Sequence, residues 1–259
     1  MNKVLVILFL SMIGSTCVSA AESAASVILS VGKNTAQLPD QELRSLKRKS
    51  LIFQQDLVST GSNGRLQLRF TDNSRVSLRP DTLFKVDEYQ YQKNDPSKGK
   101  SVYRLLKGGL RTITGAISDG DVDNYQIQTP IATIGVRGTH YSLFYCDTAC
   151  HEATRSRIGL YGYVLEGEIV VGNDEGSASV RAGHYFFLGG SGSSLQIQET
   201  PFDLFEQLKD LGPNLMAGPQ GNSIPAMDVN SRSVIRIIPD PISSPDPDPI
   251  PPPGIPGYP

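Results

Sequence analysis

The sequence lacks a large excess of charge of either sign. Its 259 residues hold 24 Lys and Arg against 26 Asp and Glu, a formal net charge of −2 at pH 7. Such near-neutrality gives no general attraction to nucleic acid or to an anionic membrane. The one local basic run, residues 44–49, has no interleaved aromatic side chains on which bases could stack, so a solvated turn is expected there. Nucleic acid is therefore not an expected partner.

Recognisable catalytic and metal-binding motifs are also missing. The chain has neither a Gly-x-Ser-x-Gly nucleophile elbow nor a His-Glu-x-x-His zinc motif. The chain has three histidines, His140, His151 and His184, so counting residues does not exclude a Ser-His-acid catalytic triad. The acidic run 119–123 alternates like a calcium loop, but Pro130 stands where an EF-hand needs its glutamate. A solvated acidic turn is expected, with weak cation binding as the alternative. We predict no catalytic residue, no metal site and no cofactor.

Long apolar runs are absent after the N-terminus. Lys3 precedes an apolar stretch over residues 4–13, and the small residues that end at Ala20 fit a signal-peptidase site. We predict cleavage between Ala20 and Ala21. An uncleaved anchor is the alternative, but this stretch is too short for a bilayer, which needs about 20 apolar residues. Without a second such run, we predict no membrane span after cleavage and a periplasmic location, with secretion or outer-surface display as alternatives.

Cysteine is scarce, and after this cleavage only Cys146 and Cys150 remain. Two cysteines four positions apart in an oxidising compartment predict a short-loop disulfide at a strand end. The segment Cys-Asp-Thr-Ala-Cys-His has one residue more than the usual haem-attachment motif. A haem or zinc site that uses His151, and a reduced pair of thiols, remain the alternatives.

Alternation of apolar and polar residues dominates the middle of the chain. Residues 65–70 and 75–79 each alternate, and the polar residues 72–74 separate them, which predicts a hairpin with one apolar and one wet face. Further strands are expected at residues 84–86, 102–106, 109–114, 125–129, 131–136, 139–146, 159–165, 168–172, 177–181 and 185–188. Short strands separated by Gly, Asn or Asp predict an all-β fold, either an antiparallel sandwich or a β-roll.

Two segments of the predicted sheet resemble each other. Residues 106–112 and 165–171 both read Leu, a charged residue, Gly, any residue, then an aliphatic residue. Matching turns of this kind suggest stacked β layers, with glycine where the backbone bends sharply or adopts positive φ. A short solenoid is therefore a possible variant of the roll, although two copies are too few for a repeat protein.

One helix and a proline-rich tail are expected after the sheet. Thr200 is a suitable cap, Pro201 fits the first helical position, and Phe202, Phe205, Leu208 and Leu211 share one face. This face is expected to pack on the sheet, with docking onto a partner as the alternative. Ten of the last 21 residues are proline, which predicts a disordered tail. The predicted parts are a signal peptide at 1–20, a β domain at 26–190, a linker and amphipathic helix at 191–212, and a disordered tail at 213–259.

Residues 129–141 carry the most informative motif. Thr129, Pro130, Gly135, Arg137, Gly138 and Thr139 lie in a run of small and β-branched residues that suits a strand followed by a tight Arg-Gly turn. The run resembles the FecR domain pattern T-P-x-A-x-x-x-V-R-G-T-x-F/Y. Residues 46–61, 106–111, 164–167 and 182–183 resemble further motifs of that family in the same order. This sequence departs from the family pattern at Lys49 and Gln55, where glycine is usual, and at His140, where an acidic residue is common.

Arg137 and His140 are the candidate ligand or partner residues. Arg137 could anchor an anionic ligand or a partner carboxylate. The interpretation favoured here is structural, namely an ion pair or a guanidinium bonded to turn carbonyls that makes the loop rigid. Because His140 replaces the acidic residue, Arg137 has no familiar local carboxylate.

The resemblance narrows the function without naming a ligand. FecR proteins of iron uptake are inner-membrane regulators whose cytoplasmic segment acts on a sigma factor. A cleaved signal would separate this chain from that role, so we predict a non-enzymatic cell-envelope binding or structural module whose partner is an envelope protein or glycan. A periplasmic sensory component that acts through a separate transmembrane partner is the first alternative, and an unrecognised envelope enzyme is the second. The sequence leaves the oligomeric state open.

Overall fold

The structure is a computed structural model, which describes residues 22–119 and 122–207. All of these residues belong to the first of two compact units, Met1–Met216. The predicted cleavage site at Ala20 and Ala21, the tail at 213–259, and helix residues Leu208 and Leu211 lie outside the described residues.

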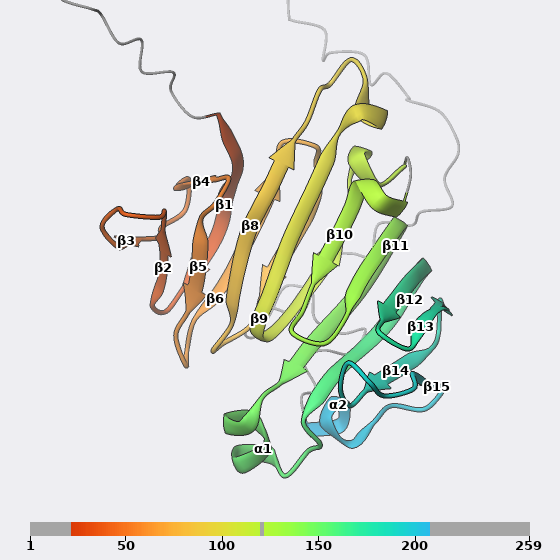
Figure 1. The fold of residues 1–259 in the computed structure, drawn as a ribbon. Helices are drawn as coiled ribbons and strands as arrows, with labels where there is room; N and C mark the ends of the chain where they lie inside the picture. The colour runs from red at the N-terminus through yellow and green to blue at the C-terminus, as the bar shows by residue number, and fades with distance from the viewer. Residues whose placement is uncertain (1–21, 120–121, 208–259) are drawn as a thin grey trace, which may run out of the picture. The chain divides into compact units, whose positions relative to one another are not determined.

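The described chain consists almost entirely of strands, which confirms the predicted all-β class. The strands are β1 (Ser23–Val31), β2 (Asn34–Gln37), β3 (Arg44–Ser45), β4 (Leu51–Phe53), β5 (Leu57–Thr60), β6 (Arg65–Phe70), β7 (Arg75–Leu78), β8 (Leu83–Gln90), β9 (Lys100–Ile113), β10 (Tyr125–Gln128), β11 (Thr133–Cys146), β12 (Gly159–Asn173), β13 (Gly176–Arg181), β14 (Tyr185–Leu188) and β15 (Gln196–Gln198). Two short α-helices accompany them, α1 (Thr148–Thr154) and α2 (Asp203–Gln207) (Figure 1). Three single-turn 3-10 helices occupy Pro96–Lys98, Ala116–Asp119 and Val122–Asn124.

Three long strands organise this fold, because each bends at a glycine and pairs with different neighbours before and after the bend. β9, β11 and β12 have 14, 14 and 15 residues. Their bends lie at Gly108, Gly138 and Gly167, where φ is 78°, 57° and 78°. Before its bend β9 pairs with β8 and, in parallel, with β10; after its bend it pairs with β7 and β11. The sequence analysis predicted two strands in place of each of these long ones.

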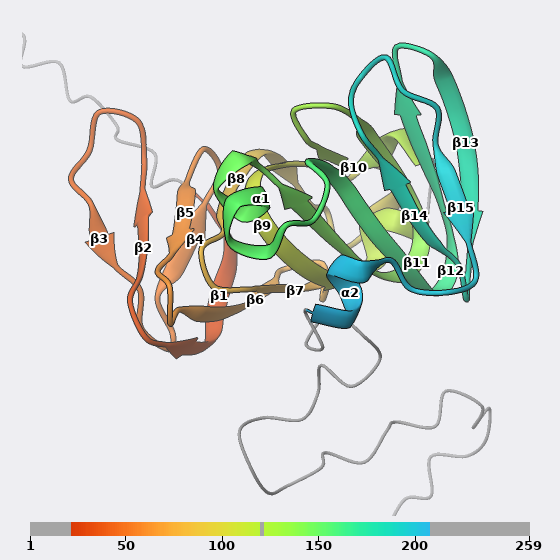
Figure 2. The ribbon, with the colours of Figure 1, turned by 90° about the horizontal axis from the view of Figure 1, so that it is seen from below.

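The bends divide one hydrogen-bonded network of strands into two layers. The first layer runs β3-β2-β5-β8, then the first half of β9, β10, the first half of β11, the second half of β12, and β13. The second layer runs β4-β1-β6-β7, then the second half of β9, the second half of β11, the first half of β12, β14 and β15. Figure 2 shows β2 and β3 at one side of the network and β13 and β15 at the other.

The hydrophobic core lies between these layers. The ring of Phe70 in β6 lies with its centroid 5.2 Å from the ring of Tyr89 in β8 and 5.0 Å from that of Tyr103 in β9. Because β6 does not pair with β8, these contacts join the two layers face to face. Alternating side chains of β6 and β7 point into this core, as their buried and exposed residues alternate strictly.

The resemblance between residues 106–112 and 165–171 has a structural counterpart. Gly108 and Gly167 have the same φ, and each marks the place where a long strand passes from one layer to the other. A Cβ atom would approach the carbonyl oxygen of Asp81 to 2.7 Å at Gly108, and that of Gly138 to 2.7 Å at Gly167. Glycine is therefore required at both positions by conformation and by space.

Several elements differ from the sequence prediction. The first strand begins at Ser23, three residues before the predicted domain boundary, and β1 to β5 were not predicted as strands. β15 lies in the segment expected to be a linker, and α1 was not expected. α2 begins at Asp203, and its buried Phe205, together with Phe202, packs near Tyr161 on the outer side of the second layer. Neither described α-helix has the length and apolar content to cross a bilayer.

Candidate functional site

The segment 129–141 forms a turn, a strand and a bend. Thr129 closes the turn between β10 and β11, since its hydroxyl accepts a hydrogen bond from the amide of Ala132 at 3.0 Å and its amide donates to the Ala132 carbonyl at 2.8 Å. Pro130 and Ile131 lie in this turn rather than in a strand. Gly135 lies in β11, where a Cβ atom would meet Val122 at contact distance. These residues position the bend that follows.

The bend itself consists of Arg137, Gly138 and Thr139. Thr139 is buried, its amide donates to the hydroxyl of Thr114 at 2.9 Å, and its carbonyl accepts from the amide of Thr114 at 3.1 Å. Gly138 has left-handed φ, but a Cβ atom added there would meet nothing within 4 Å. The bend is thus anchored at Thr139 and open at Gly138.

Arg137 faces a hollow in the surface. The hollow has a volume of 580 Å³ and is lined by Asp119, Arg137, Gly138, Gly167, Glu168, Arg181 and Ala182. Glu168 lies opposite Arg137 in the strand register, but its carboxylate approaches Arg181, with 3.6 Å between the nearest atoms. Arg137 is exposed, and within residues 22–119 and 122–207 it makes no hydrogen bond or ion pair. The contacts expected for a structural Arg137 are therefore not observed, and its guanidinium remains available to an anionic group.

His140 belongs to a different site from Arg137. Its Nε2 accepts a hydrogen bond of 2.6 Å from Nε of Arg111 in β9. Burial first, and then the positive charge of Arg111, lower the pKa of His140 to about 4. The imidazole is therefore neutral at pH 7, with the accepting nitrogen unprotonated.

Arg111 is a further candidate residue, which sequence reasoning did not single out. Only 6% of it is exposed, and burial lowers its pKa, while the nearby charge of Glu166 acts in the opposite direction. Residue 140 thus contacts the buried cation of Arg111 rather than Arg137. The predicted strand alternation could have placed Arg111 on the outer face, but its pairing with His140 needed the register between β9 and β11.

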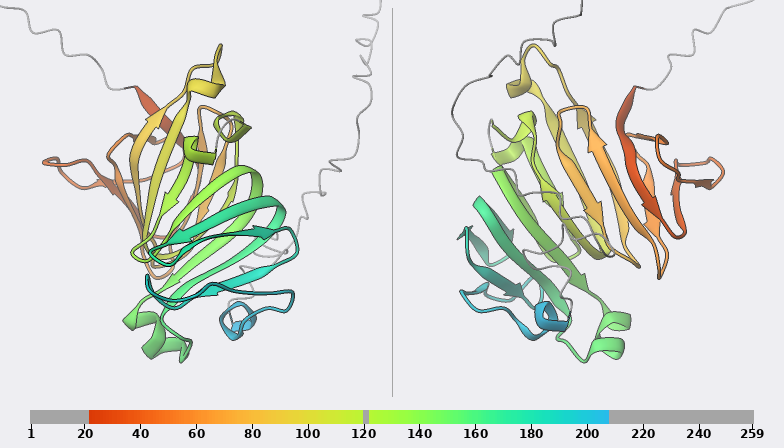
Figure 3. Two further views of the ribbon diagram at one scale, coloured as in Figure 1. Left: turned by 45° about the vertical axis from the view of Figure 1, so that its right-hand side comes forward. Right: turned by 180° about the vertical axis from the view of Figure 1, so that it is seen from behind.

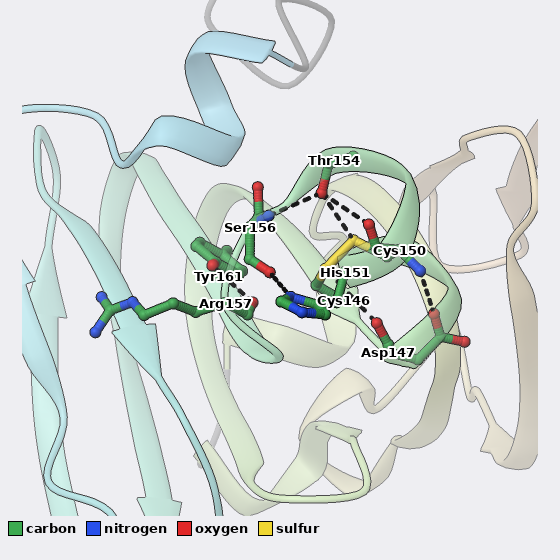
Figure 4. Close-up of a disulfide and its surroundings, with 8 residues drawn as sticks. All are labelled: Cys146, Asp147, Cys150, His151, Thr154, Ser156, Arg157 and Tyr161. Atoms are coloured by element: carbon green, nitrogen blue, oxygen red, sulfur yellow. Dashed lines mark hydrogen bonds between the residues drawn. A yellow bond between two sulfur atoms is a disulfide. The ribbon is translucent and has the colours of Figure 1, made fainter.

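The two cysteines are joined in a disulfide in the structure (Figure 4). Cys146 ends β11 and is buried, and Cys150 lies in α1 with its Cα 5.2 Å from that of Cys146. The side chain of Asp147 caps α1 by accepting a hydrogen bond of 2.9 Å from the amide of Cys150. Nδ1 of His151 lies 2.7 Å from the carbonyl oxygen of Ser156. Sulfurs bonded to each other cannot serve as thiolate ligands, so this geometry fits a structural disulfide rather than a haem or zinc site.

The described residues contain no arrangement that resembles a catalytic or metal centre. His140 contacts Arg111, His151 contacts a backbone carbonyl, and Nε2 of His184 lies 3.9 Å from a carboxylate oxygen of Glu199. No cluster of three or more His, Cys, Asp or Glu residues that could hold a metal ion occurs in this part of the chain. Of the predicted acidic turn, Asp121 is outside the described residues, and Asp119 lines the hollow.

Comparison with known proteins places part of the hollow within a recognised domain, since Arg181 and Ala182 of its lining lie beyond the matched residues. Residues 56–170 match the sequence model of the family described as FecR protein, and this range includes Arg111, Arg137 and His140. No curated protein sequence matches the chain.

Two solved structures align with part of the chain. Both are crystal structures of a protein from Parabacteroides distasonis described as a "putative anti-sigma factor", at 2.50 and 1.65 Å resolution. Each is 12% identical in sequence, with TM-scores of 0.42 and 0.41, and each alignment covers 55% of this chain and 58% of the other. The aligned part thus spans little more than half of those proteins. On the family match, residues 56–170 of this chain carry a FecR domain.

Proposed function

We propose that this chain is an exported sensory component of a surface-signalling system, which binds an envelope partner and acts through a separate transmembrane protein. The observation that carries the proposal is the FecR domain at residues 56–170, whose Arg-Gly bend presents to a hollow the exposed Arg137, which has no partner among the described residues. The signal-like residues 1–20 support export. A non-enzymatic binding or structural module without a signalling role is the second candidate, favoured by the same surface hollow.

The hollow would recognise a carboxylate or phosphate group on the partner. Arg137 offers a planar, permanently charged donor, and Arg181 adds a second guanidinium on the same rim. Asp119 and Glu168 restrict the approach to a partner whose anionic group reaches Arg137 without lying against either carboxylate. The contact would therefore be specific in position rather than a general attraction of opposite charges.

Capture from envelope fractions tests the binding step. Full-length protein carrying a photo-crosslinking residue at position 138, where a side chain would meet no neighbour, should capture a discrete envelope protein. Adding Arg137→Ala should reduce that capture by about tenfold, whereas Arg48→Ala, which removes an exposed cation elsewhere, should not change it. Equal capture by both variants would remove Arg137 from the contact.

A transcriptional measurement separates signalling from binding alone. Deletion of the gene in its native organism should change transcripts controlled by one alternative sigma factor, and Arg137→Ala should reproduce the change. Unchanged transcripts together with retained capture would favour the binding or structural module. Turnover of a glycan or ester by purified protein would favour an enzyme.

A further inference from the structure

The two layers end in outermost strands of unequal length. These strands are β3 and β13 in the first layer and β4 and β15 in the second. β3, β4 and β15 have two or three residues each, whereas β13 has six. β13 lies at the outer side of the network in Figure 2 and can be followed by its teal colour in Figure 3. One of the four outer edges is therefore long.

The outer edge of β13 has no strand beside it in the part of the chain that the structure describes. Its residues pair consecutively with β12, from Gly176 opposite Asn173 to Arg181 opposite Glu168, and β12 is its one described neighbour. An edge strand presents a row of unpaired backbone N–H and C=O groups to a further strand. Very short edge strands limit such pairing, and β3, β4 and β15 fit that pattern. β13 does not.

The sequence of β13 leaves this edge open to pairing. It contains neither lysine nor proline, and its pairs with β12 run without a register shift. Lysine, proline and β-bulges are the usual means by which proteins protect an edge. The first four residues of β13 are Gly, Ser, Ala and Ser, so no bulky side chain keeps another backbone away from this part of the edge.

The charges along this edge have opposite signs at its two ends. Asp174 and Glu175 form the turn that precedes β13, and both are exposed. Arg181 ends β13 with 79% of its side chain exposed, and its ion pair with Glu168 is loose, with 3.6 Å between the nearest atoms. A strand that runs antiparallel to β13 meets this pattern in reverse order. A second copy of β13 would therefore bring its acidic turn beside Arg181.

Apolar surface lies behind the same edge. A groove of 270 Å³ separates β13 from the segment that links β14 to β15, and its apolar lining residues are Val171, Ala178, Leu188 and Leu195. Ile197 in β15 lies opposite Phe186, a buried residue of the core between the layers, so it faces the same way. Nevertheless 42% of Ile197 is exposed. The core is thus incompletely covered at this end of the layers, where a second copy would cover it.

We propose that the chain forms a two-fold symmetric dimer in which the β13 strands of two copies pair antiparallel and continue the first layer from one copy into the other. Position 178 lies midway between positions 175 and 181, so pairing centred on Ala178 places Glu175 of each copy opposite Arg181 of the other. Because a two-fold interface uses the same surface of both copies, this favourable contact occurs twice. Pairing through this one long edge closes after two copies.

An extended segment of another protein fits the edge less well than a second copy. Such a segment would have to carry an acidic and a basic residue at the spacing that matches Glu175 and Arg181, whereas β13 with its turn already carries both. The inference does not rest on the proposed signalling role, because the edge of β13 makes the dimer contacts and Arg137 lies in β11.

Sedimentation equilibrium of the full-length protein over a range of concentrations tests the proposal. The original protein should show a concentration-dependent equilibrium between monomer and dimer. Glu175→Arg and Arg181→Glu should each raise the dissociation constant about tenfold, since each reversal replaces two exposed ion pairs, each worth a few-fold, with repulsion. The two reversals combined should restore the original dissociation constant, because the opposite charges face each other again.

A lysine within the edge tests the strand pairing independently of these ion pairs. Ala178→Lys should raise the dissociation constant more than tenfold, because an inward-pointing charge on an edge strand opposes pairing with another strand. Ala178 is only partly buried and borders the groove, so the monomer should still fold. An unchanged far-ultraviolet circular dichroism spectrum would verify that the monomer folds.

Matched charge reversals far from β13 provide the control. Glu42→Arg and Arg48→Glu alter exposed residues next to β3, at the other end of the first layer, and should leave the dissociation constant unchanged. A protein that stays monomeric at every concentration would overturn the proposal, as would a combined variant that does not restore the dimer or a folded Ala178→Lys variant that dimerises normally. A monomer that loses capture of an envelope protein through Ala178→Lys would also overturn it, in favour of strand addition by another protein.

Discussion

Two bends of this protein each have an arginine close to a glycine, and they differ in structure. Near the bend of β9, Gly108 has no room for a side chain, and Arg111 is buried against His140. At the bend of β11, Gly138 has ample space, and Arg137 is exposed without a described partner. An arginine close to a glycine therefore does not define one role. The first bend serves packing, whereas the second leaves a cation and an open hollow for a ligand.

The largest expected effect separates the two glycines. Gly108→Ala should lower the free energy of unfolding by about 3 kcal/mol, because the new Cβ would lie 2.6 Å from the hydroxyl oxygen of Thr82 in a left-handed conformation. Gly138→Ala should cost about 1 kcal/mol, from backbone conformation alone. Chemical denaturation of both variants measures the difference. Equal losses of stability in the two variants would show that close packing at Gly108 adds nothing to the cost of the backbone conformation.

The disulfide at the end of β11 should give the next largest effect. Replacing Cys146 and Cys150 with alanine should lower the free energy of unfolding by about 2 kcal/mol, as expected for a short closed loop. Reductant-treated wild-type protein, measured by the same denaturation, is the matched sample and should lose a similar amount. Mass analysis of the exported protein without reductant should give a mass two hydrogens below that of the reduced chain; two free thiols would contradict the disulfide.

Acid should lower the stability of the protein through His140, which contacts Arg111 near the bend of β9, and not through the exposed Arg137 at the bend of β11. The pKa of His140 is about 4 in the folded protein, below its usual value, so the unfolded chain binds the proton first as pH falls from about 6.5. Stability should therefore fall between pH 6.5 and 4, by on the order of 1 kcal/mol for this half-buried group. Denaturation at several pH values measures it. His140→Asn should remove this loss, and His184→Asn should retain it.

Lys49 tests the cost of a left-handed backbone at a position where the side chain does not pack against neighbours. Its φ of 74° is left-handed although it is not glycine, and its side chain is exposed. Lys49→Gly should raise the free energy of unfolding by about 0.5 kcal/mol, the relief of strain less the added chain entropy. Lys47→Gly, at an exposed position without positive φ, should lower it instead. A loss at both positions in thermal melts would show that strain at Lys49 is negligible.

The smallest stability effect is expected at the open bend. Arg137→Ala should change the melting temperature by no more than a surface substitution does, because no described contact is lost. Its consequence should be confined to partner capture. Unfolding of this variant would restore the structural role that the sequence analysis favoured and erase the distinction from Arg111.

Much of the fold could be predicted from local pattern. Alternation located β6, β7, β13 and β14 to within one or two residues, since a half-buried strand exposes every second side chain. The early strands β1 to β5 were missed, because β2 to β5 have only two to four residues each and the burial of the nine-residue β1 does not alternate along its whole length. The merging of strand pairs at Gly108, Gly138 and Gly167 was missed, because a glycine that ends one strand and a glycine that bends a longer one read alike.

Some contacts of the candidate residues could also be predicted from sequence proximity, and others could not. Cys146 and Cys150 were expected to pair because they are close in sequence, and the structure joins them. Arg137 and His140 were expected together for the same reason, but the bend at Gly138 turns them toward different surroundings. Lys49 and Gln55, at positions where the resemblance to the family leads one to expect glycine, both have positive φ. These turns thus adopt a left-handed conformation without the residue that favours it.

By itself, the sequence determined the all-β class, the hairpin alternation and the FecR motifs, because each depends on residues close together in the chain. Only the tertiary structure decided which cation is buried and which is exposed, and which strand forms the long outer edge of the first layer. The physical reason is register. Arg111 meets His140 and lies beside the β6–β7 hairpin through hydrogen-bonded pairings between strands that are 29 to 37 residues apart, and no local pattern specifies such pairings.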